Sequence, residues 1–335
     1  MDARTTPDDR FAQAAEAGIH RLAIPTPFAV GRVNVYLIED DPLTLVDAGP
    51  NSGTSFDVLQ RGIAQLGHQL EDIELVILTH QHIDHLGLVS LVARHAGAEV
   101  AALDVAVPFV ENYSSEAQAD DDFAYEMMLR HGIPPDVASA LRSVTRAYRA
   151  WGAPAEITRV LSDGDELRFR DRVLEVHHRP GHSPSDMLLH DRERRMLIAG
   201  DHLLPHISSN PLMTRPLDGS GERPQSLVIY LESMTKTREM DLELVLPGHG
   251  DPITDHRALI DERFSLHERR AAKIERLIAE RPRSAHELAQ ALWGNIAVTQ
   301  AYLTLSEILG HVDVLTNAGT VRDVDRDGVS IFEAA

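Results

Sequence analysis

Short apolar runs separated by turn residues dominate the first hundred positions of the chain. Residues 33–38 are rich in β-branched and aromatic side chains, and residues 74–78 form a continuous apolar run, which is typical of buried strands. Apolar residues recur with helical spacing from 52 to 66, and a second helix is expected over residues 86–95. The expected strands in this part are residues 21–24, 33–38, 43–46, 74–78 and 99–102.

The pattern changes between about residues 108 and 154. This stretch is helix-like, carries the acidic run 120–122, and is interrupted by Pro134, Pro135 and Gly152. We interpret it as a helical lid inserted between the two halves of a sheet sandwich. Strands return afterwards at residues 166–169, 173–176, 187–189, 196–198 and 243–246, with a helix at 224–237.

The C-terminal part is expected to form a small second domain. A long helix is predicted from about residue 256 to 281, and Ser284 is a favoured N-cap for the element that follows. The later elements are helices at 285–292 and 299–318 and strands at 321–324 and 329–332. Three helices with a terminal hairpin outline a winged-helix-like module. We therefore expect a catalytic domain over residues 1–262 and a winged-helix-like domain over residues 263–335.

The composition limits the chemistry that the chain can use. It has 18 histidines and no cysteine, which excludes disulfides, thiolate ligands and a cysteine nucleophile, so any metal site must use His, Asp or Glu. The formal net charge is −20, and almost all of it belongs to the part before Arg263, because the remainder holds nine basic and ten acidic residues. Such acidity repels nucleic-acid backbones and anionic membranes.

Location is expected from what the sequence does not contain. The first ten residues are polar and show no signal peptide, and no segment approaches the ~18 apolar residues that span a membrane. We expect a cytoplasmic protein without membrane association.

Four metal-competent side chains fall within six positions directly after the apolar run 74–78. They are His80, His82, Asp84 and His85, in the segment THQHIDHLG. Histidines two apart can point to one side of an extended loop and share one ion, while Asp84 and His85 fall on the next turn and can serve a second. Neutral imidazoles and carboxylates suit zinc, iron or manganese.

Three further candidates each follow an apolar strand and have a glycine beside them. They are His182 in PGHS, Asp201 in GDH and His249 in PGHG. The glycines allow the backbone to turn sharply. Strand ends that converge on one edge would collect all seven side chains into one nest of ligands.

With these motifs in this order, residues 20–255 resemble the metallo-β-lactamase fold family, most closely the glyoxalase II-like hydrolases. The resemblance implies an αββα sandwich and two divalent metal ions, with zinc expected first and iron or manganese as alternatives. Asp47 matches a family position that supports the metal loop by hydrogen bonds. The implied ligands are His80, His82 and His182 for the first metal and Asp84, His85 and His249 for the second, with Asp201 bridging both.

The expected reaction is metal-assisted hydrolysis. Two metal ions ~3.5–4 Å apart can share a hydroxide that forms near neutral pH and attacks a carbonyl or a phosphorus. Asp84 could orient this nucleophile and carry its proton toward the leaving group. Apolar lid residues favour an ester, thioester or lactone of a small organic acyl compound. The candidate substrate contacts are His202, His206, Tyr113 and Tyr125, although packing in the lid's own core is the role we favour for most of the lid's aromatic residues.

Two other functions remain open. A phosphodiesterase or endoribonuclease could use the same centre, and residues 263–283 carry seven basic against three acidic residues, yet the acidic catalytic part would steer a polyanion poorly. A non-enzymatic regulator that binds DNA and senses a ligand would not need an open seven-ligand site. A homodimer also remains open. Glutathione thioesters are disfavoured as substrates, because the enzymes that hydrolyse them usually end in a different helical domain.

Overall fold

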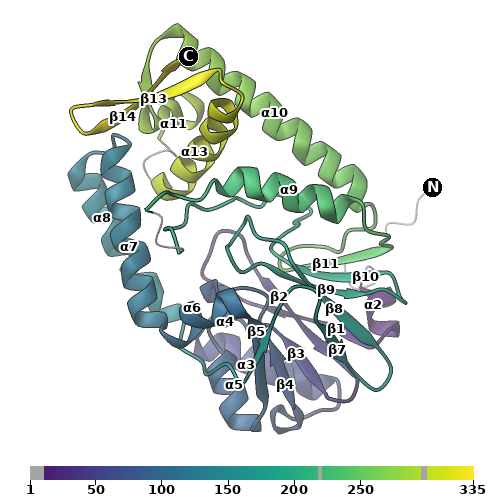
Figure 1. Cartoon of the computed structure of the whole chain (residues 1–335). Helices are drawn as coiled ribbons and strands as arrows, with labels where there is room; N and C mark the ends of the chain where they lie inside the picture. Colours follow the sequence, from purple (N-terminus) through teal and green to yellow (C-terminus); the bar gives the residue numbers. More distant parts are fainter. Residues whose placement is uncertain (1–10, 218–220, 296–299) are drawn as a thin grey trace. The chain divides into compact units, whose positions relative to one another are not determined.

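The computed structural model describes residues 11–217, 221–295 and 300–335 (Figure 1). The polar first ten residues, and residue 299 at the start of an expected helix, lie outside this description. The chain divides into two compact units. The first comprises Met1–Glu116, Arg149–Ser209 and Arg238–Arg257, and the second comprises Ala117–Tyr148, Asn210–Thr237 and Ala258–Ala335.

A six-stranded sheet forms the centre of the first unit, with its strands in chain order from β1 to β6. The pairs β1–β2 and β2–β3 are antiparallel, and the pairs from β3 to β6 are parallel. The strands are β1 (Ile19–Ile24), β2 (Val33–Ile38), β3 (Thr44–Val46), β4 (Leu75–Ile77), β5 (Glu99–Leu103) and β6 (Arg159–Leu161). The sequence pattern predicts all of these except β6.

A five-stranded sheet in the order β11-β10-β9-β8-β7 completes the sandwich. Its neighbours are antiparallel except for β10 and β11, which run parallel, so the carboxyl ends of these two strands lie at the same edge. The strands are β7 (Glu166–Arg168), β8 (Val173–His178), β9 (Met187–Asp191), β10 (Met196–Gly200) and β11 (Leu244–Pro247).

Side-chain alternation along the strands separates two cores. In β2, Tyr36 and Ile38 pack in the core between the two sheets, whereas Val35 and Leu37 face helices on the other side. The helices contribute Leu59 and other apolar residues to that second core. The helical segments of this unit are α2 (Ala12–Glu16), α3 (Gly53–Gln65), η1 (Leu70–Asp72), α4 (Ile83–Leu86), α5 (Val89–Ala96), η2 (Asp104–Ala106), α6 (Val107–Glu111) and η3 (Arg149–Trp151).

Local signals explain where these helices begin and break. Ser52 caps α3 by accepting a hydrogen bond from the backbone N–H of Ser55 at 3.0 Å. The helix expected over residues 86–95 is instead two helices, α4 and α5, that meet at Gly87. A Cβ at Gly87 would lie 2.2 Å from the backbone nitrogen of Asn51, so the chain packs too closely here for any larger residue.

The second unit gathers the predicted lid and the C-terminal part into one compact body. Met128 and Ile133 of the lid share a core with Ile274, Leu288 and Leu305. The unit is therefore larger than the module expected over residues 263–335. Its elements are α7 (Tyr113–Arg130), α8 (Pro135–Tyr148), α9 (Ser226–Arg238), α10 (His256–Glu280), β12 (Arg283–Ser284), α11 (Ala285–Trp293), α13 (Ala301–Asn317), β13 (Val321–Arg326) and β14 (Val329–Ala334).

From α10 onward the described residues form a helix, a strand, two helices and a hairpin, and β12, β14 and β13 form a three-stranded sheet. A capping box at Ser284 and Glu287 begins α11, as the sequence suggests. A winged-helix-like module in this part of the chain stays a prediction. Within the described residues, no helix combines the length and apolar character that crossing a membrane requires.

Candidate metal centre

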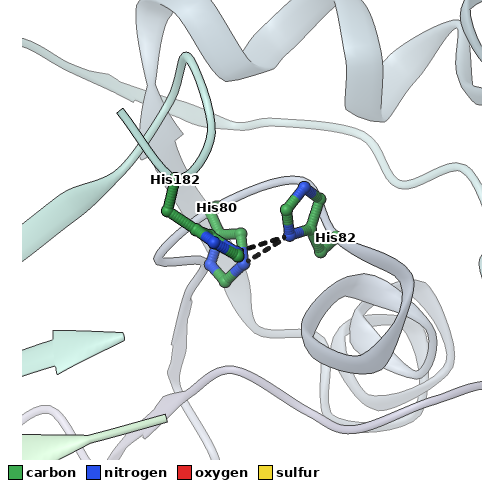
Figure 2. Close-up of side chains that lie close together, drawn as sticks. All are labelled: His80, His82 and His182. Carbon is green, nitrogen blue, oxygen red and sulfur yellow. Dashed lines mark hydrogen bonds between the residues drawn. The ribbon is translucent and has the colours of Figure 1, made fainter. Parts of the chain in front are cut away.

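Three histidines from two distant loops converge on one point of the first unit (Figure 2). Nδ1 of His82 lies 3.1 Å from Nε2 of His80 and 2.9 Å from Nε2 of His182. Ligand nitrogens in a tetrahedral zinc site with bonds of about 2.0–2.1 Å are about 3.3 Å apart. The three imidazoles are thus spaced as ligands of one ion would be.

A second group adjoins the first through one carboxylate. Nε2 of His249 lies 3.3 Å from Oδ2 of Asp84 and 3.5 Å from Oδ2 of Asp201. The Asp201 carboxylate is also 3.5 Å from Nε2 of His85 and 3.6 Å from Nε2 of His182. Asp201 therefore lies between histidines of both groups. All seven residues that the motifs select lie together.

The fold brings these residues together because each follows a strand. His80 and His82 follow β4, His182 follows β8, Asp201 follows β10 and His249 follows β11. The glycine before His249 has a direct steric reason. A Cβ at Gly248 would lie 2.2 Å from Oδ1 of Asp201, so only glycine lets the two ligand loops come this close.

Asp47 orients the histidine loop from behind. Its carboxylate accepts hydrogen bonds from the backbone N–H and the hydroxyl of Thr79, both at 2.8 Å, and from Nδ1 of His85 at 2.7 Å. Because the Thr79 hydroxyl donates to Asp47, its oxygen is left to accept from Nδ1 of His80, which is 3.1 Å away. Both histidines therefore direct Nε2 at the centre. Asp47 has φ of 61°, an unusual value for a residue other than glycine.

The third oriented histidine depends on a backbone group that no sequence signal identifies. Nδ1 of His249 donates to the carbonyl of Arg32 at 2.8 Å, which leaves Nε2 directed at the two carboxylates. Asn34 supports the same loop, since its amide donates to the carbonyls of Pro247 and Gly250, both at 2.9 Å. The apolar pattern of β2 predicts a strand there but not this polar contact.

Burial sets the protonation of the three-histidine group. Burial and the neighbouring imidazole of His85 hold the pKa of His80 well below its usual value. Burial and His182 lower the pKa of His82 to about 3. Both rings are therefore neutral at pH 7, the form that binds a metal ion.

The group beside the carboxylates behaves in the opposite way. Burial opposes a charge on His249, but Asp201 and Asp84 outweigh it and raise the pKa of His249 to about 10. Burial also opposes a charge on His85, yet Asp47 and Asp201 hold its pKa well above the usual value. Without metal these rings carry protons, and an incoming metal cation must displace them.

Three buried polar atoms test whether a metal pair fits. Nε2 of His85, Nε2 of His249 and Oδ1 of Asp201 have no hydrogen-bond partner within the described part of the chain. Buried polar groups are normally satisfied, so these three atoms point to an absent partner. Imidazole nitrogens and carboxylate oxygens directed at one another fit divalent ions.

The candidate substrate residues differ in where they lie. His202 is fully buried and its ring hydrogen-bonds the backbone of Arg179. Tyr113 is also buried, and its hydroxyl donates to the carbonyl of Arg149 at 2.8 Å. Both contacts are structural, and a role in substrate binding stays a prediction for both residues.

Two other candidates remain predictions. The His206 side chain is 68% exposed and lies 3.5 Å from a carboxylate oxygen of Asp251. Tyr125 belongs to the second unit, where it packs at the edge of the core under the guanidinium of Arg142, 5.0 Å from the ring centre. That core position is the alternative role expected from the sequence.

Comparison with known proteins identifies the family. A profile of the family described as the metallo-beta-lactamase superfamily matches residues 29–249. The chain belongs to this superfamily. It is 37% identical over 301 residues to the Probable metallo-hydrolase YqjP of Bacillus subtilis (strain 168), which covers 88% of this chain and 91% of that protein.

Solved structures agree with this assignment. A metallo-beta-lactamase family protein from Thermus thermophilus is similar with a TM-score of 0.81 and 25% identity, over 95% of this chain and 99% of that one. The metallo-β-lactamase fold expected from the resemblance is therefore confirmed. The family and the relatives support a metal-dependent hydrolase.

The match to a third relative covers less than half of either protein. The chain is 34% identical over 137 residues to a protein named Acyl-coenzyme A thioesterase MBLAC2 from Gallus gallus. The match spans 38% of this chain and 40% of that protein.

Proposed function

We propose that the chain is a dinuclear metal hydrolase that cleaves acyl thioesters, within the wider class of small esters, thioesters and lactones. The observation that carries the proposal is the position of Asp201, whose carboxylate oxygens lie 3.5–3.6 Å from histidines of both ligand groups. A carboxylate placed in this way suits a pair of ions better than a single one. Zinc is our proposal for the metals, because the donors are mainly imidazoles.

When bound, such a pair supplies a water of lowered pKa and polarises the substrate carbonyl. The chain's own residues hold and move the proton. Burial raises the pKa of Asp84, but His249 and His85 outweigh it and keep this carboxyl ionised at neutral pH. Asp84 can therefore accept the proton of the attacking water and pass it to the departing group.

The leaving group favours a thioester. A thiol has a pKa near 8.5, so a thiolate departs with little help from an acid. Asp84 is the one carboxylate that we assign to proton transfer in this centre. An alcohol is a poorer leaving group than a thiol, so an ester would need protonation of its leaving oxygen as the bond breaks. The relative named Acyl-coenzyme A thioesterase MBLAC2 supports the same choice.

The competing functions lack a comparable observation. Nucleic-acid cleavage and ligand-sensed DNA binding both require attraction of a polyanion, and the net charge of −20 opposes it. We propose a small-molecule substrate and not a nucleic acid.

The test is a substrate panel on the metal-loaded protein, comprising an acyl-coenzyme A, an uncharged thioester, a lactone, a β-lactam and a phosphodiester. We expect the thioesters to be turned over fastest. We expect Asp84→Asn to lower kcat by roughly 10²–10⁴-fold, because the amide cannot take the proton. Its metal content and unfolding midpoint, measured in parallel, separate lost proton transfer from lost metal. Preferred cleavage of the phosphodiester would refute the proposal.

A further inference from the structure

A groove with three arginines lies between β1 and α3 of the first unit. Its volume is about 390 Å³. Leu22 and Gly62 approach each other closely at this place, since a Cβ at Gly62 would lie 2.8 Å from a methyl of Leu22. Arginine side chains from both elements and from the loop before β2 line the groove: Arg21, Arg32 and Arg61. A polar groove of this kind suits an anion better than an apolar ligand.

The charge in the groove is not neutralised by the protein. Within residues 11–217, 221–295 and 300–335, no carboxylate lies within ion-pair distance of Arg21 or Arg32, whereas Arg61 pairs with Asp57 one helical turn away. Two arginines without an acidic partner are unexpected in a chain with 52 acidic and 32 basic residues. Arg61 and Asp57 are both exposed, so this pair can exchange partners at little cost.

The two unpaired arginines are held in place by neutral contacts. Nε of Arg21 donates to Oδ1 of Asn34 at 2.6 Å, and its guanidinium lies 4.7 Å from the ring centre of Phe11. The guanidinium of Arg32 donates to the carbonyl of Ala23 at 2.9 Å. Each side chain keeps further N–H groups that can bind an anion. Guanidinium groups bind phosphate in a bidentate manner.

The groove adjoins the metal centre through shared residues. The backbone carbonyl of Arg32 accepts the hydrogen bond that orients His249. Asn34, which holds Arg21, also donates to the carbonyls on both sides of the His249 loop. One end of the groove therefore lies on the segment that supports a proposed metal ligand. A substrate whose acyl group reached the centre could extend its remainder into the groove.

We propose that this groove binds the phosphate-bearing part of the substrate, so that the enzyme acts on acyl thioesters of a small phosphorylated thiol such as coenzyme A. This inference rests on the proposed thioesterase function. It assigns the anion recognition to the first unit and gives the arginines a role in substrate selection.

The test compares two thioesters of the same acyl group. One carries coenzyme A, and the other carries N-acetylcysteamine, which has the same reacting bond and no phosphate. We expect Arg32→Ala to lower kcat/KM for the coenzyme A thioester roughly tenfold, mainly through KM, because charge-assisted hydrogen bonds are lost. We expect kcat/KM for the uncharged thioester to change less than twofold. Arg94→Ala, an exposed arginine on α5 outside the groove, is the matched control and should change neither ratio.

The outcomes separate the two proposals. Arg32→Ala keeps the backbone carbonyl that orients His249, so equal losses on both thioesters would show that the substitution disturbs the loop and removes no phosphate contact. No loss on either thioester would show that the groove does not bind phosphate. Each result overturns the inference while leaving the thioesterase proposal intact. If the wild-type protein cleaves neither thioester, the proposed function fails. Calorimetric titration with free coenzyme A then still tests whether the groove binds phosphate. Weaker binding by Arg32→Ala than by the wild-type protein would support the inference, and equal binding or no binding would overturn it.

Discussion

Two of the histidine clusters in the described chain, one in each unit, differ in what their nitrogens face. In the second unit, His267 of α10 and His311 of α13 lie with Nδ1 and Nε2 3.2 Å apart, and Glu307 is close enough to complete a set of three metal donors. Nδ1 of His311 donates to the carbonyl of Glu307 at 2.7 Å, and Arg270 pairs with the Glu307 carboxylate. The protein itself satisfies most of this cluster.

The strand-end cluster of the first unit is arranged the other way. Its outer nitrogens are tied to Asp47, Thr79 and the Arg32 carbonyl, and its inner nitrogens converge on one another and on the Asp201 carboxylate. No arginine or lysine in the described residues pairs with Asp201 within ion-pair distance. Nearness of histidines and carboxylates is therefore not enough to indicate a metal site. Histidine nitrogens that converge on a carboxylate without an arginine or lysine partner are the better criterion.

The largest expected effect comes from removing the shared carboxylate. We expect Asp201→Ala to lower kcat/KM by roughly 10³-fold or more and to reduce the bound metal, because one side chain serves both ions. Activity assays and elemental analysis on the same preparation measure both quantities. His267→Leu, in the cluster of the second unit, is the control and should keep the metal bound at the strand-end cluster. Full activity in Asp201→Ala would mean that the two clusters do not differ as described.

The sequence motifs select seven side chains that lie together in the structure, because each follows a predicted strand, and three of them have a glycine beside them. They give no comparable signal for residues that bind the substrate. His202 follows Asp201 directly, but adjacency does not tell which way the chain turns, and the ring is buried against the backbone of Arg179. The Arg32 carbonyl has no sequence signal at all, since any residue provides one.

A smaller effect is expected from the helical cluster. We expect His267→Leu to lower the free energy of unfolding by about 1–3 kcal/mol, because Nε2 of His311 is left buried without its donor. Its kcat/KM should stay within twofold of wild type. Urea unfolding followed by fluorescence can isolate this unit in a Trp151→Phe background, where Trp293 of α11 is the single tryptophan. Loss of metal from His267→Leu would contradict the distinction between the clusters.

The pattern of apolar residues predicts most strands because they are buried on both faces and read as continuous apolar runs. It misses β6, which has three residues of which only Leu161 is buried. It predicts helices in the lid but not their packing with the C-terminal helices. That packing joins Met128 and Ile133 to residues more than a hundred positions away, and such contacts leave no local periodicity.

The smallest expected effect is a difference in pH dependence between the clusters. Burial lowers the pKa of His267 to about 4, below the usual 6.5, so its contribution to stability is present above pH 6.5 and lost as the pH falls toward 4. In metal-free protein the pKa of His249 is raised to about 10, so its contribution is present below pH 6.5 and lost as the pH rises through 10. Urea unfolding across this range, with Trp151 and Trp293 each removed in turn, should give slopes of opposite sign. Equal slopes would refute this difference.

Elemental analysis of the wild-type chain, reconstituted with zinc and freed of excess metal by dialysis, addresses the central interpretation most directly. Seven donor side chains, with Asp201 shared between the two ligand groups, predict two ions per chain. Both ions should be lost together in Asp201→Ala. One ion per chain or none, or two ions retained without Asp201, would contradict a dinuclear centre.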